Sequence, residues 1–502
     1  MSGVVLTPLR VERSAVQRGL RGVPLVRTGM GERCAGDGVL RRIDGAEAAL
    51  VAGVAGGLAP QVRPGDVVVA SEVHLPEQPT GGPGRVVPVT SAPMLAAALR
   101  RAGLTVHVGP LLGADGVVSG QARRLHGEQG LLAVDMESGR LAAAVGERPI
   151  AVVRAVVDTA DHPLLHPGTP LRGVRALAAL RRAAPVLRDW VAAAGAREVL
   201  LAGPRSFCAG VERAIETVER AIDRFGAPVY VRRQIVHNVH VVRQLEERGA
   251  VFVTELDEVP DGARVVLAAH GVAPAVRAEA ARRGLFVVDA TCPLVAKVHA
   301  EVRRYAGMGS SVLLVGHADH EEVEGTVGEA PEDVLVVEDV ASAEVVQPRN
   351  PGQVAYVMQT TLATDEADQI TDVLRRRFPS LQAPRSDDIC YATTNRQRAV
   401  RDVARQVDLV LVVGSENSSN SKRLVEVAER EGAQAHLVED AGAVDLRWLA
   451  GAGRVGITAG ASAPPHLVDE LVQALAGLGP VSAREVRTSD EDVAFTLPKE
   501  VV

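Results

Sequence analysis

The sequence has few aromatic residues, few lysines and few cysteines, and each shortage limits what the protein can be. Aromatic residues make up 2% of the chain, so its cores must be built from valine, leucine and alanine. Four cysteines in 502 residues do not make the dense disulfide framework of small secreted domains. Positive charge is nearly all arginine, since the only lysines are Lys297, Lys422 and Lys499. A formal net charge of −7 argues against a general nucleic-acid binder.

Long apolar runs are also missing. No stretch of about 18 apolar residues predicts a membrane span. The first residues lack the charged and apolar segments of a secretory signal. We therefore expect a cytoplasmic protein without a membrane span. The length suffices for about three or four domain-sized units, and a hydrophobic content of 47% is typical of globular proteins.

Three of the four cysteines occupy equivalent points of a repeated pattern. Residues 286–302 (F-V-V-D-A-T-C-P-L-V-A-K-V-H-A-E-V) predict a strand, a tight loop, Cys292 and a helix. Cys208 and Cys390 follow the same plan, each after an apolar strand and before a helix, which predicts three small α/β lobes. A cysteine at the positive end of a helix dipole favours the thiolate. The alternative is three unrelated buried cysteines, because free cysteine often packs as an apolar residue.

Polar side chains follow the predicted strands between these cysteines. Ligands of open α/β lobes gather beyond the carboxyl ends of strands, and these side chains offer many hydrogen-bond donors. Such a set suits a multiply charged ligand such as a diphosphate, with helix N-termini adding donors. For any single histidine among them the alternative is a structural role. The residues are His237, Asn238, His240, His270, His317, His320, Glu322, Glu324, Thr360, Thr361, Ser418, Ser419, Asn420 and Ser462.

The ligand types limit the choice of metal. Three thiolates suit zinc or an iron–sulfur cluster. A structural zinc site usually has two cysteines within a few residues of each other, whereas each of these cysteines stands alone in its lobe. A [4Fe-4S] cluster normally takes four thiolates, so three thiolates leave one iron open to a substrate.

Short stretches spread over residues 198–497 match one family in that family's own order. They are F-C-A-G-V, I-V-H-N, A-H-G-V, D-A-T-C-P-L-V, E-V-E-G-T, Q-T-T-L, D-I-C-Y-A-T-T-N-R-Q, N-S-S-N-S, T-A-G-A-S-A-P and V-A-F-T-L-P. By these motifs the segment resembles the 4-hydroxy-3-methylbut-2-enyl diphosphate reductase (LytB or IspH) family. The resemblance implies three α/β lobes around a central iron–sulfur cluster. It also implies reduction of the hydroxylated diphosphate to isopentenyl and dimethylallyl diphosphate, the last step of the methylerythritol phosphate pathway.

The resemblance also implies a role for each residue. Cys208, Cys292 and Cys390 would hold a [4Fe-4S] cluster, and Glu322 would donate a proton to the leaving hydroxide. Electrons would come from a ferredoxin or a flavodoxin. Substrate would contact a further set, in which Thr360 faces the hydroxyl region and His320 assists proton delivery. That set is His237, His270, His320, Thr360, Ser418, Ser419, Asn420 and Ser462.

The segment departs from the family pattern at three positions. Ser206 replaces a glycine that is common before the first cysteine motif. Asp319 and Glu321 stand where glycine and proline are usual beside His320. None of these changes removes a ligand, but an extra carboxylate near Glu322 is expected to shift its proton affinity.

The first third of the chain carries different motifs. Glycine-rich turns fall at 28–31 and 51–58, followed by A-V-D-M-E-S (Met136, Glu137) and V-V-D-T-A-D (Asp158). Over residues 1–165 these motifs resemble the purine nucleoside phosphorylase and nucleosidase superfamily. By that resemblance Glu137 would hold the ribose hydroxyls and Met136 would pack on the sugar. Asp158 would protonate the purine, although helix capping is an alternative for this aspartate.

Two further residues bear on this resemblance. Glu12 matches a position that orients a water in the nucleosidases, whereas Val54 replaces a small polar residue. One branch of the superfamily acts on adenosylhopane, so release of adenine from an adenosyl compound is a hypothesis for this part of the chain. The alternative is a catalytically inert N-terminal module, because a fold does not determine a function.

The join between the two halves is predicted near Gly195. Residues 171–194 predict a helix interrupted near Pro185, after which a new strand begins. The expected fold is therefore α/β: a phosphorylase-like domain at 1–195, then a reductase domain at 196–502 with three small lobes around a central iron–sulfur cluster. An iron–sulfur sensor without turnover is the alternative for the second half, but it leaves Glu322 and the hydroxyl-rich loops unexplained.

Overall fold

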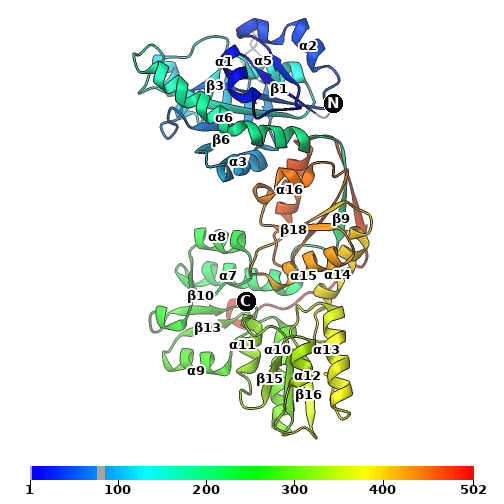
Figure 1. Ribbon diagram of the computed structural model, residues 1–502. Helices are drawn as coiled ribbons and strands as arrows, with labels where there is room; N and C mark the ends of the chain where they lie inside the picture. Colours follow the sequence, from blue (N-terminus) through cyan, green and yellow to red (C-terminus); the bar gives the residue numbers. More distant parts are fainter. Residues whose placement is uncertain (1–2, 76–84) are drawn as a thin grey trace. The chain divides into compact units, whose positions relative to one another are not determined.

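The computed structural model describes residues 3–75 and 85–502, and the chain divides into two compact units (Figure 1). The first unit comprises Met1–Val199, Glu439–Val455 and Asp469–Arg484. The second comprises Leu200–Val438, Gly456–Val468 and Glu485–Val502. These units are defined by contacts, and the domain boundary at 195–196 stays a prediction. No helix in the described ranges is long and apolar enough to cross a membrane.

The first unit contains an eight-stranded mixed sheet with the order β2-β1-β3-β7-β6-β4-β5, in which β8 pairs with both β3 and β4. Central strands β3 and β8 are almost entirely buried, as expected for strands covered on both faces. The strands are β1 (Gly3–Thr7), β2 (Leu25–Arg27), β3 (Ala48–Gly57), β4 (Val67–His74), β5 (Val86–Pro88), β6 (Val106–Gly113), β7 (Ala133–Asp135) and β8 (Ile150–Asp158). The helices are α1 (Arg10–Gln17), α2 (Asp37–Ile43), α3 (Ala92–Arg101), α4 (Gly120–Glu128), α5 (Ser138–Val145) and α6 (Thr169–Ala193), with a short 3-10 turn at Gly31–Ala35.

The interruption predicted near Pro185 is wrong, because α6 is one continuous helix that contains Pro185. Proline removes one helical hydrogen bond, but buried residues on both sides of it hold the helix in place. Ala184 and Leu187 are fully buried. Trp190 is also fully buried, and its indole N–H donates to Ser91 Oγ at 3.1 Å. Packing on both sides of the proline therefore outweighs the local preference of the sequence.

The predicted three α/β lobes are confirmed by three further sheets. The first has the order β11-β10-β12-β13, the second β15-β14-β16 and the third β18-β17-β19-β9-β20. All pairs in the first two sheets are parallel. In the third sheet, β17 is a fully buried Leu-Val-Leu-Val-Val run that pairs in parallel with β18.

The elements of each lobe are as follows. The first lobe has β10 (Val229–Arg232), β11 (Ala250–Val253), β12 (Arg264–Leu267), β13 (Phe286–Asp289), α7 (Ala209–Phe225), α8 (Val239–Glu247) and α9 (Pro274–Arg282). The second has β14 (Ser311–Val315), β15 (Val334–Val337), β16 (Val354–Met358), α10 (Pro293–Gly307), α11 (Glu321–Val327), α12 (Val340–Val345) and α13 (Thr364–Arg377). The third has β9 (Arg197–Gly203), β17 (Leu409–Val413), β18 (Gln434–Val438), β19 (Arg454–Ala459), β20 (Val481–Arg487), α14 (Tyr391–Ala404), α15 (Ser419–Arg430) and α16 (Pro465–Ala476). Short 3-10 turns lie at Leu256–Glu258, Ala441–Ala443, Leu446–Leu449 and Lys499–Val501.

Each of the three cysteines caps the N-terminus of a helix, as predicted. Cys208 precedes α7, Cys292 precedes α10 and Cys390 precedes α14. Strand β9 leads toward Cys208 and strand β13 toward Cys292. The apolar strand predicted before Cys390 is wrong, because the chain between α13 and Cys390 has one isolated bridge, at Gln382, and no strand. This segment contains two prolines and three charged residues, which do not favour a buried strand.

Candidate functional site

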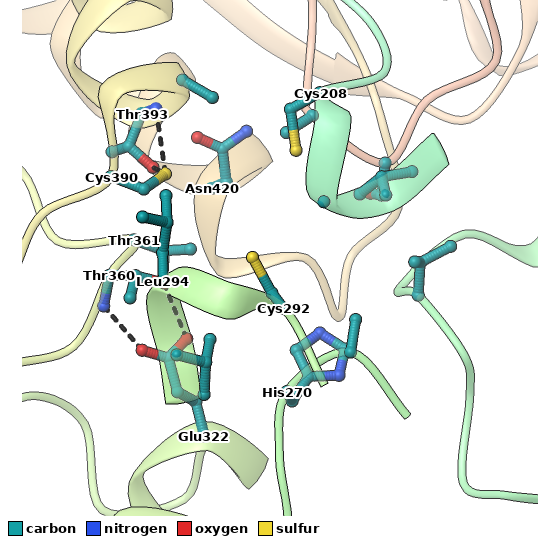
Figure 2. Close-up of a pocket in the computed structure, with 18 of the residues that line it drawn as sticks. Cys208, His270, Cys292, Leu294, Glu322, Thr360, Thr361, Cys390, Thr393 and Asn420 are labelled. Atoms are coloured by element: carbon teal, nitrogen blue, oxygen red, sulfur yellow. Dashed lines mark hydrogen bonds between the residues drawn. The ribbon is translucent and has the colours of Figure 1, made fainter. Parts of the chain in front are cut away.

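A single pocket of the second unit is lined by every site residue that the family resemblance implies for that part of the chain. Figure 2 labels Cys208, His270, Cys292, Glu322, Thr360, Cys390 and Asn420 among them. The residues come from the loops that follow β9, β10, β12, β13, β14, β16, β17 and β19, and from the start of α14. This is the edge where parallel α/β sheets bind ligands. The predicted residues in the lining are Cys208, His237, His270, Cys292, His320, Glu322, Thr360, Cys390, Ser418, Ser419, Asn420 and Ser462.

The three sulfur atoms are directed into the same space. Figure 2 shows Cys208, Cys292 and Cys390 approaching it from three helix N-termini. Gly210 makes this approach possible, because a Cβ on it would lie 2.8 Å from the sulfur of Cys292 and 3.8 Å from that of Cys208. A side chain at this position would therefore fill the space between two sulfurs.

The expectation that the helix dipole favours a thiolate is wrong for Cys292, and the pKa of Cys390 is shifted in the same direction. Burial, with a smaller contribution from the neighbouring Cys208, raises the pKa of Cys292 to about 11, although backbone N–H groups of α10 oppose the rise. Burial likewise raises the pKa of Cys390 to about 12, against hydrogen bonds from Thr393. Desolvation outweighs the dipole at these two cysteines, and the positive charge of a bound metal would favour their thiolates.

Glu322 is almost completely buried and is held by one residue. Its carboxylate accepts the Thr360 backbone N–H at 2.6 Å and the Thr360 hydroxyl at 2.9 Å. Burial, with a smaller contribution from the carboxylate of Asp388, raises the pKa of Glu322 to about 7 against these hydrogen bonds. Asp319 and Glu321 were expected to supply such a charge, but the carboxylate that acts on Glu322 is Asp388. A carboxyl group with this pKa can hold and release a proton at neutral pH.

The three histidines form one aromatic cluster. The rings of His237 and His270 stack with centroids 4.0 Å apart, and the ring of His320 meets them edge-on at 5.5 and 5.8 Å. Burial lowers the pKa of His237 and of His320 to about 4, and it lowers the pKa of His270 as well. Among the described residues that line the pocket there is no lysine or arginine. An anion there would be bound by N–H and O–H donors rather than by fixed cations.

Side chains of the third lobe complete this donor set. Ser418 caps α15, and its hydroxyl oxygen accepts the backbone N–H of Ser421 at 3.3 Å. Asn420 is buried, and both polar atoms of its amide lack a protein partner. Ser462 donates its hydroxyl to the carbonyl of His237 at 2.9 Å, and Ser419 accepts from Thr361 at 3.3 Å. The unpartnered Asn420 amide is therefore available to a ligand.

Several lining residues were not predicted as site residues. These are Tyr391, Thr393 and Phe495. Thr361, which was expected beyond a strand end but was given no role, also lines the pocket, whereas Asn238, His240, His317 and Glu324 are not part of its lining. Thr393 donates its backbone N–H to the Cys390 sulfur at 3.3 Å, and its hydroxyl lies 3.1 Å from that sulfur. The signal was present in the motifs Q-T-T-L, C-Y-A-T-T-N and V-A-F-T-L-P, but one sequence does not show which motif residues face inward.

The first unit has its own pocket, and all four residues predicted there line it. They are Glu12, Met136, Glu137 and Asp158. Glu12 is buried and accepts the backbone N–H groups of Leu9 at 2.6 Å and Val54 at 2.8 Å. The position that departs from the superfamily pattern, Val54, thus contacts Glu12 through its backbone.

A fully buried arginine organises the carboxylates of this pocket. Arg154 pairs with Asp135 at 2.6 Å and lies 4.0 Å from Glu137. Burial raises the pKa of Glu12 and that of Glu137, and the charge of Arg154 opposes the rise in both. Gly53 leaves room for this arrangement, because a Cβ there would lie 2.1 Å from an Arg154 nitrogen.

Asp158 does not cap the following helix, since Gly168 occupies the N-cap of α6. It instead forms a buried ion pair with Arg123 at 2.6 Å, and Arg123 also donates to the Gly57 carbonyl at 3.0 Å. Arg123 lines the pocket but was not predicted. Its position on α4 carries no motif that would have marked it.

Comparison with known proteins agrees with the two-part organisation. Residues 17–188 match the Phosphorylase superfamily, and residues 199–476 match the LytB protein family. The chain belongs to the LytB protein family. The 4-hydroxy-3-methylbut-2-enyl diphosphate reductase of Leifsonia xyli subsp. xyli is 55% identical over 308 residues, which cover 61% of this chain and 91% of that relative. The reductase of the same name from Xanthomonas campestris pv. campestris is 54% identical over 309 residues, covering 61% and 98%.

A solved structure supports the fold of the LytB part. The structure of the E-1-hydroxy-2-methyl-but-2-enyl-4-diphosphate reductase from Plasmodium falciparum aligns with a TM-score of 0.59 and 36% identity. The alignment covers 61% of this chain and 97% of that one. The family and fold class predicted from the motifs are therefore confirmed.

Proposed function

We propose that this chain is a 4-hydroxy-3-methylbut-2-enyl diphosphate reductase that yields isopentenyl and dimethylallyl diphosphate. The observation that carries the proposal is the common pocket. Three cysteines from separate lobes, one buried carboxyl group and a set of uncharged donors all face it. The relatives that bear this name cover 61% of the chain at 54–55% identity, and the LytB family match, residues 199–476, contains every one of these residues.

The pocket fits a [4Fe-4S] cluster held by Cys208, Cys292 and Cys390. Three free thiols face one space, and Gly210 leaves the room between two of them empty of side chain. Three thiolates leave one iron of such a cluster without a protein ligand. When bound, the cluster supplies two single electrons and a Lewis-acidic iron for the substrate hydroxyl.

The residues of the chain supply the binding and the protons. His237, His270 and Asn420 donate to the diphosphate, and Ser418, Ser419 and Ser462 surround it. The carbon–oxygen bond of the allylic alcohol breaks as two electrons and two protons enter, giving one water and a new carbon–hydrogen bond. Glu322 gives the proton that makes the hydroxyl a better leaving group. Thr360 holds the Glu322 carboxyl group in place and faces the substrate hydroxyl, and His320 assists proton delivery.

The electron donor and the cellular compartment are proposed from the chemistry of the cluster and its cysteine ligands. Two one-electron steps suit a ferredoxin or a flavodoxin as donor. We propose the cytoplasm as the compartment, because its reducing conditions keep cysteines available as metal ligands, and the four cysteines of this chain are free.

The direct test is turnover of the hydroxylated diphosphate by the reconstituted full chain with a reduced one-electron donor. Formation of both isopentenyl and dimethylallyl diphosphate supports the proposal. An iron–sulfur sensor would bind the cluster but form neither product, and that result would reject the reductase.

A second candidate activity belongs to the first unit. Its pocket brings together Glu12, Glu137, Met136 and Asp158, and residues 17–188 match the Phosphorylase superfamily. We propose cleavage of a purine nucleoside there, with adenosyl compounds such as adenosylhopane as first candidates. Release of adenine by the full chain, with and without phosphate, tests the activity. No release from any adenosyl compound would favour the inert N-terminal module.

A further inference from the structure

Each cysteine-capped helix of the second unit carries a basic residue in its second turn. These are Arg213 on α7, Lys297 on α10 and Arg396 on α14. None of the three lines the pocket. Each one instead donates hydrogen bonds to the backbone just before the cysteine that caps another of these three helices. We call them the bridging residues.

Arg213 connects the Cys208 helix to the Cys292 loop. Its guanidinium donates to the carbonyls of Ala290 at 3.0 Å and Thr291 at 3.1 Å, the two residues before Cys292. It also donates to the carbonyl of Thr496 at 2.7 Å. The position of Cys292 relative to α7 is thus set through its own backbone.

Lys297 connects the Cys292 helix to the Cys390 segment. Its ammonium donates to the carbonyls of Ser386 at 2.7 Å and Asp387 at 2.8 Å, and to the carboxylate of Asp388 at 3.0 Å. Three acceptors around one nitrogen match the three N–H donors of an ammonium group, whereas a guanidinium spreads its donors over three nitrogens in one plane. Lysine therefore suits this position in a chain whose other positive charges are nearly all arginine.

Arg396 connects the Cys390 helix back to the Cys208 loop. It is fully buried, and it donates to the carbonyl of Ser206 at 2.6 and 3.1 Å and to that of Phe207 at 3.1 Å. Glu491 accepts from the same guanidinium at 3.0 Å. Ser206 has a φ of 62°, a left-handed conformation that disfavours residues other than glycine. The arginine therefore fixes a loop that would otherwise relax.

The three connections close a ring: Cys208 helix to Cys292 loop, Cys292 helix to Cys390 segment, and Cys390 helix to Cys208 loop. Hydrogen bonds from charged donors are stronger than neutral ones, and these act on the backbone next to each sulfur. We propose that Arg213, Lys297 and Arg396 are positioning residues that assemble the three thiols before any metal binds. This inference rests on the proposed function only where it describes the three thiols as metal ligands.

This circular arrangement of hydrogen bonds predicts which pair of cysteines each bridging residue holds together. Full-length protein without a cluster is treated with a short bifunctional thiol reagent, and the cross-linked peptides are mapped by mass spectrometry. Arg213→Met is expected to lower the Cys208–Cys292 cross-link about tenfold, because charged hydrogen bonds are lost. The Cys292–Cys390 cross-link should stay within about twofold of wild type, as expected for sites that do not couple.

The same cross-linking measurement applies to the other two bridging residues, Lys297 and Arg396. Lys297→Met should lower the Cys292–Cys390 cross-link, and Lys297→Arg should not restore it. Arg396→Met should lower the Cys390–Cys208 cross-link. Because Arg396 is fully buried, Arg396→Lys is measured beside it, and the same cross-link should fall in a chain that keeps the charge. Arg220→Met is the matched control, since this exposed arginine of α7 pairs with Glu216 on the same helix at 2.9 Å.

Two outcomes would overturn the proposal. Equal loss of all three cross-links in each variant would mean that these residues only stabilise the fold. Unchanged cross-links would mean that the lobes hold the thiols without them. The measurement needs neither a cluster nor turnover, so its result is independent of whether the chain is a reductase.

Discussion

Replacing Glu322 by glutamine tests the proposed proton donor with little change of shape. Glu322 is 2% exposed, and its carboxylate oxygens accept the backbone N–H and the hydroxyl of Thr360. Glutamine keeps the volume and one carbonyl oxygen for the Thr360 N–H, but it has no acidic proton. Because general acid catalysis contributes about 100- to 10,000-fold, turnover should fall by that factor, or about 3–5 kcal/mol of barrier.

The pH dependence of turnover provides a second test of Glu322 and has a predicted direction. Burial raises the pKa of Glu322 to about 7, so the group carries its proton below that pH and loses it above. Wild-type turnover should fall as the pH rises through about 7, whereas the residual turnover of Glu322→Gln should lack this step. The expected change concerns the rate of the proton-dependent step rather than substrate binding.

The assay compares wild type with Glu322→Gln after reconstitution, using the same one-electron donor and diphosphate substrate. Glu324→Gln is the matched control, because Glu324 lies on the same helix but pairs with Arg233 at 2.7 Å. The absorption spectrum should show equal cluster content in all three proteins. Turnover of Glu322→Gln within about threefold of wild type would refute the assignment of Glu322 as the acid.

Three further predictions concern Thr360, Cys292 and Asp158. Thr360→Val removes a hydrogen bond that lowers the pKa of Glu322, so the alkaline limb of the pH–rate profile should move up by roughly one pH unit; a limb that moves down would contradict this. Cys292→Ser should abolish turnover and strongly reduce the iron content after reconstitution, as measured by metal analysis, and a full iron content would show that this cysteine is not a ligand. Asp158→Asn should abolish adenine release by the first unit and leave reductase turnover within about twofold, since sites without shared contacts act independently; a matching loss of reductase turnover would contradict separate sites.

Glu322→Gln should also change stability in a pH-dependent way. The folded-state pKa of about 7 lies above the ordinary value of 4.5, so the stabilising contribution of the protonated group is complete below pH 4.5 and is lost as the pH rises through 7. Wild type should lose up to about 3 kcal/mol over this range relative to the glutamine variant. Denaturant unfolding at pH 5 and pH 8 measures the difference, and an equal difference at both pH values would contradict it.

Much of the reductase half could be predicted because local signals and fold agree there. Proline after Cys292 and apolar runs before Cys208 and Cys292 mark strand–loop–helix units, and the structure has helices that begin at all three cysteines. Polar residues that follow parallel strands could be predicted to lie close together, because the loops after such strands meet at one edge of the sheet. The roles given to these residues, and the domain boundary, stay predictions.

The errors arose where tertiary packing or desolvation outweighed a local rule. Pro185 predicted a break, but buried neighbours keep α6 continuous. The helix dipole predicted thiolates, but burial raises the pKa of Cys292 to about 11. Arg123 and the bridging residues could not be found, because their partners are backbone carbonyls or carboxylates far away in the sequence. Such contacts leave no local pattern.

The central claim is that three lobes hold one cluster with an exchangeable iron facing the substrate. Anaerobic reconstitution of the full chain, followed by electron paramagnetic resonance and Mössbauer spectroscopy with and without the hydroxylated diphosphate, tests it directly. We predict the spectrum of a [4Fe-4S] cluster in which one iron site changes when the diphosphate is added. A cluster whose spectrum is identical with and without the diphosphate, or the absence of any cluster, would contradict the account.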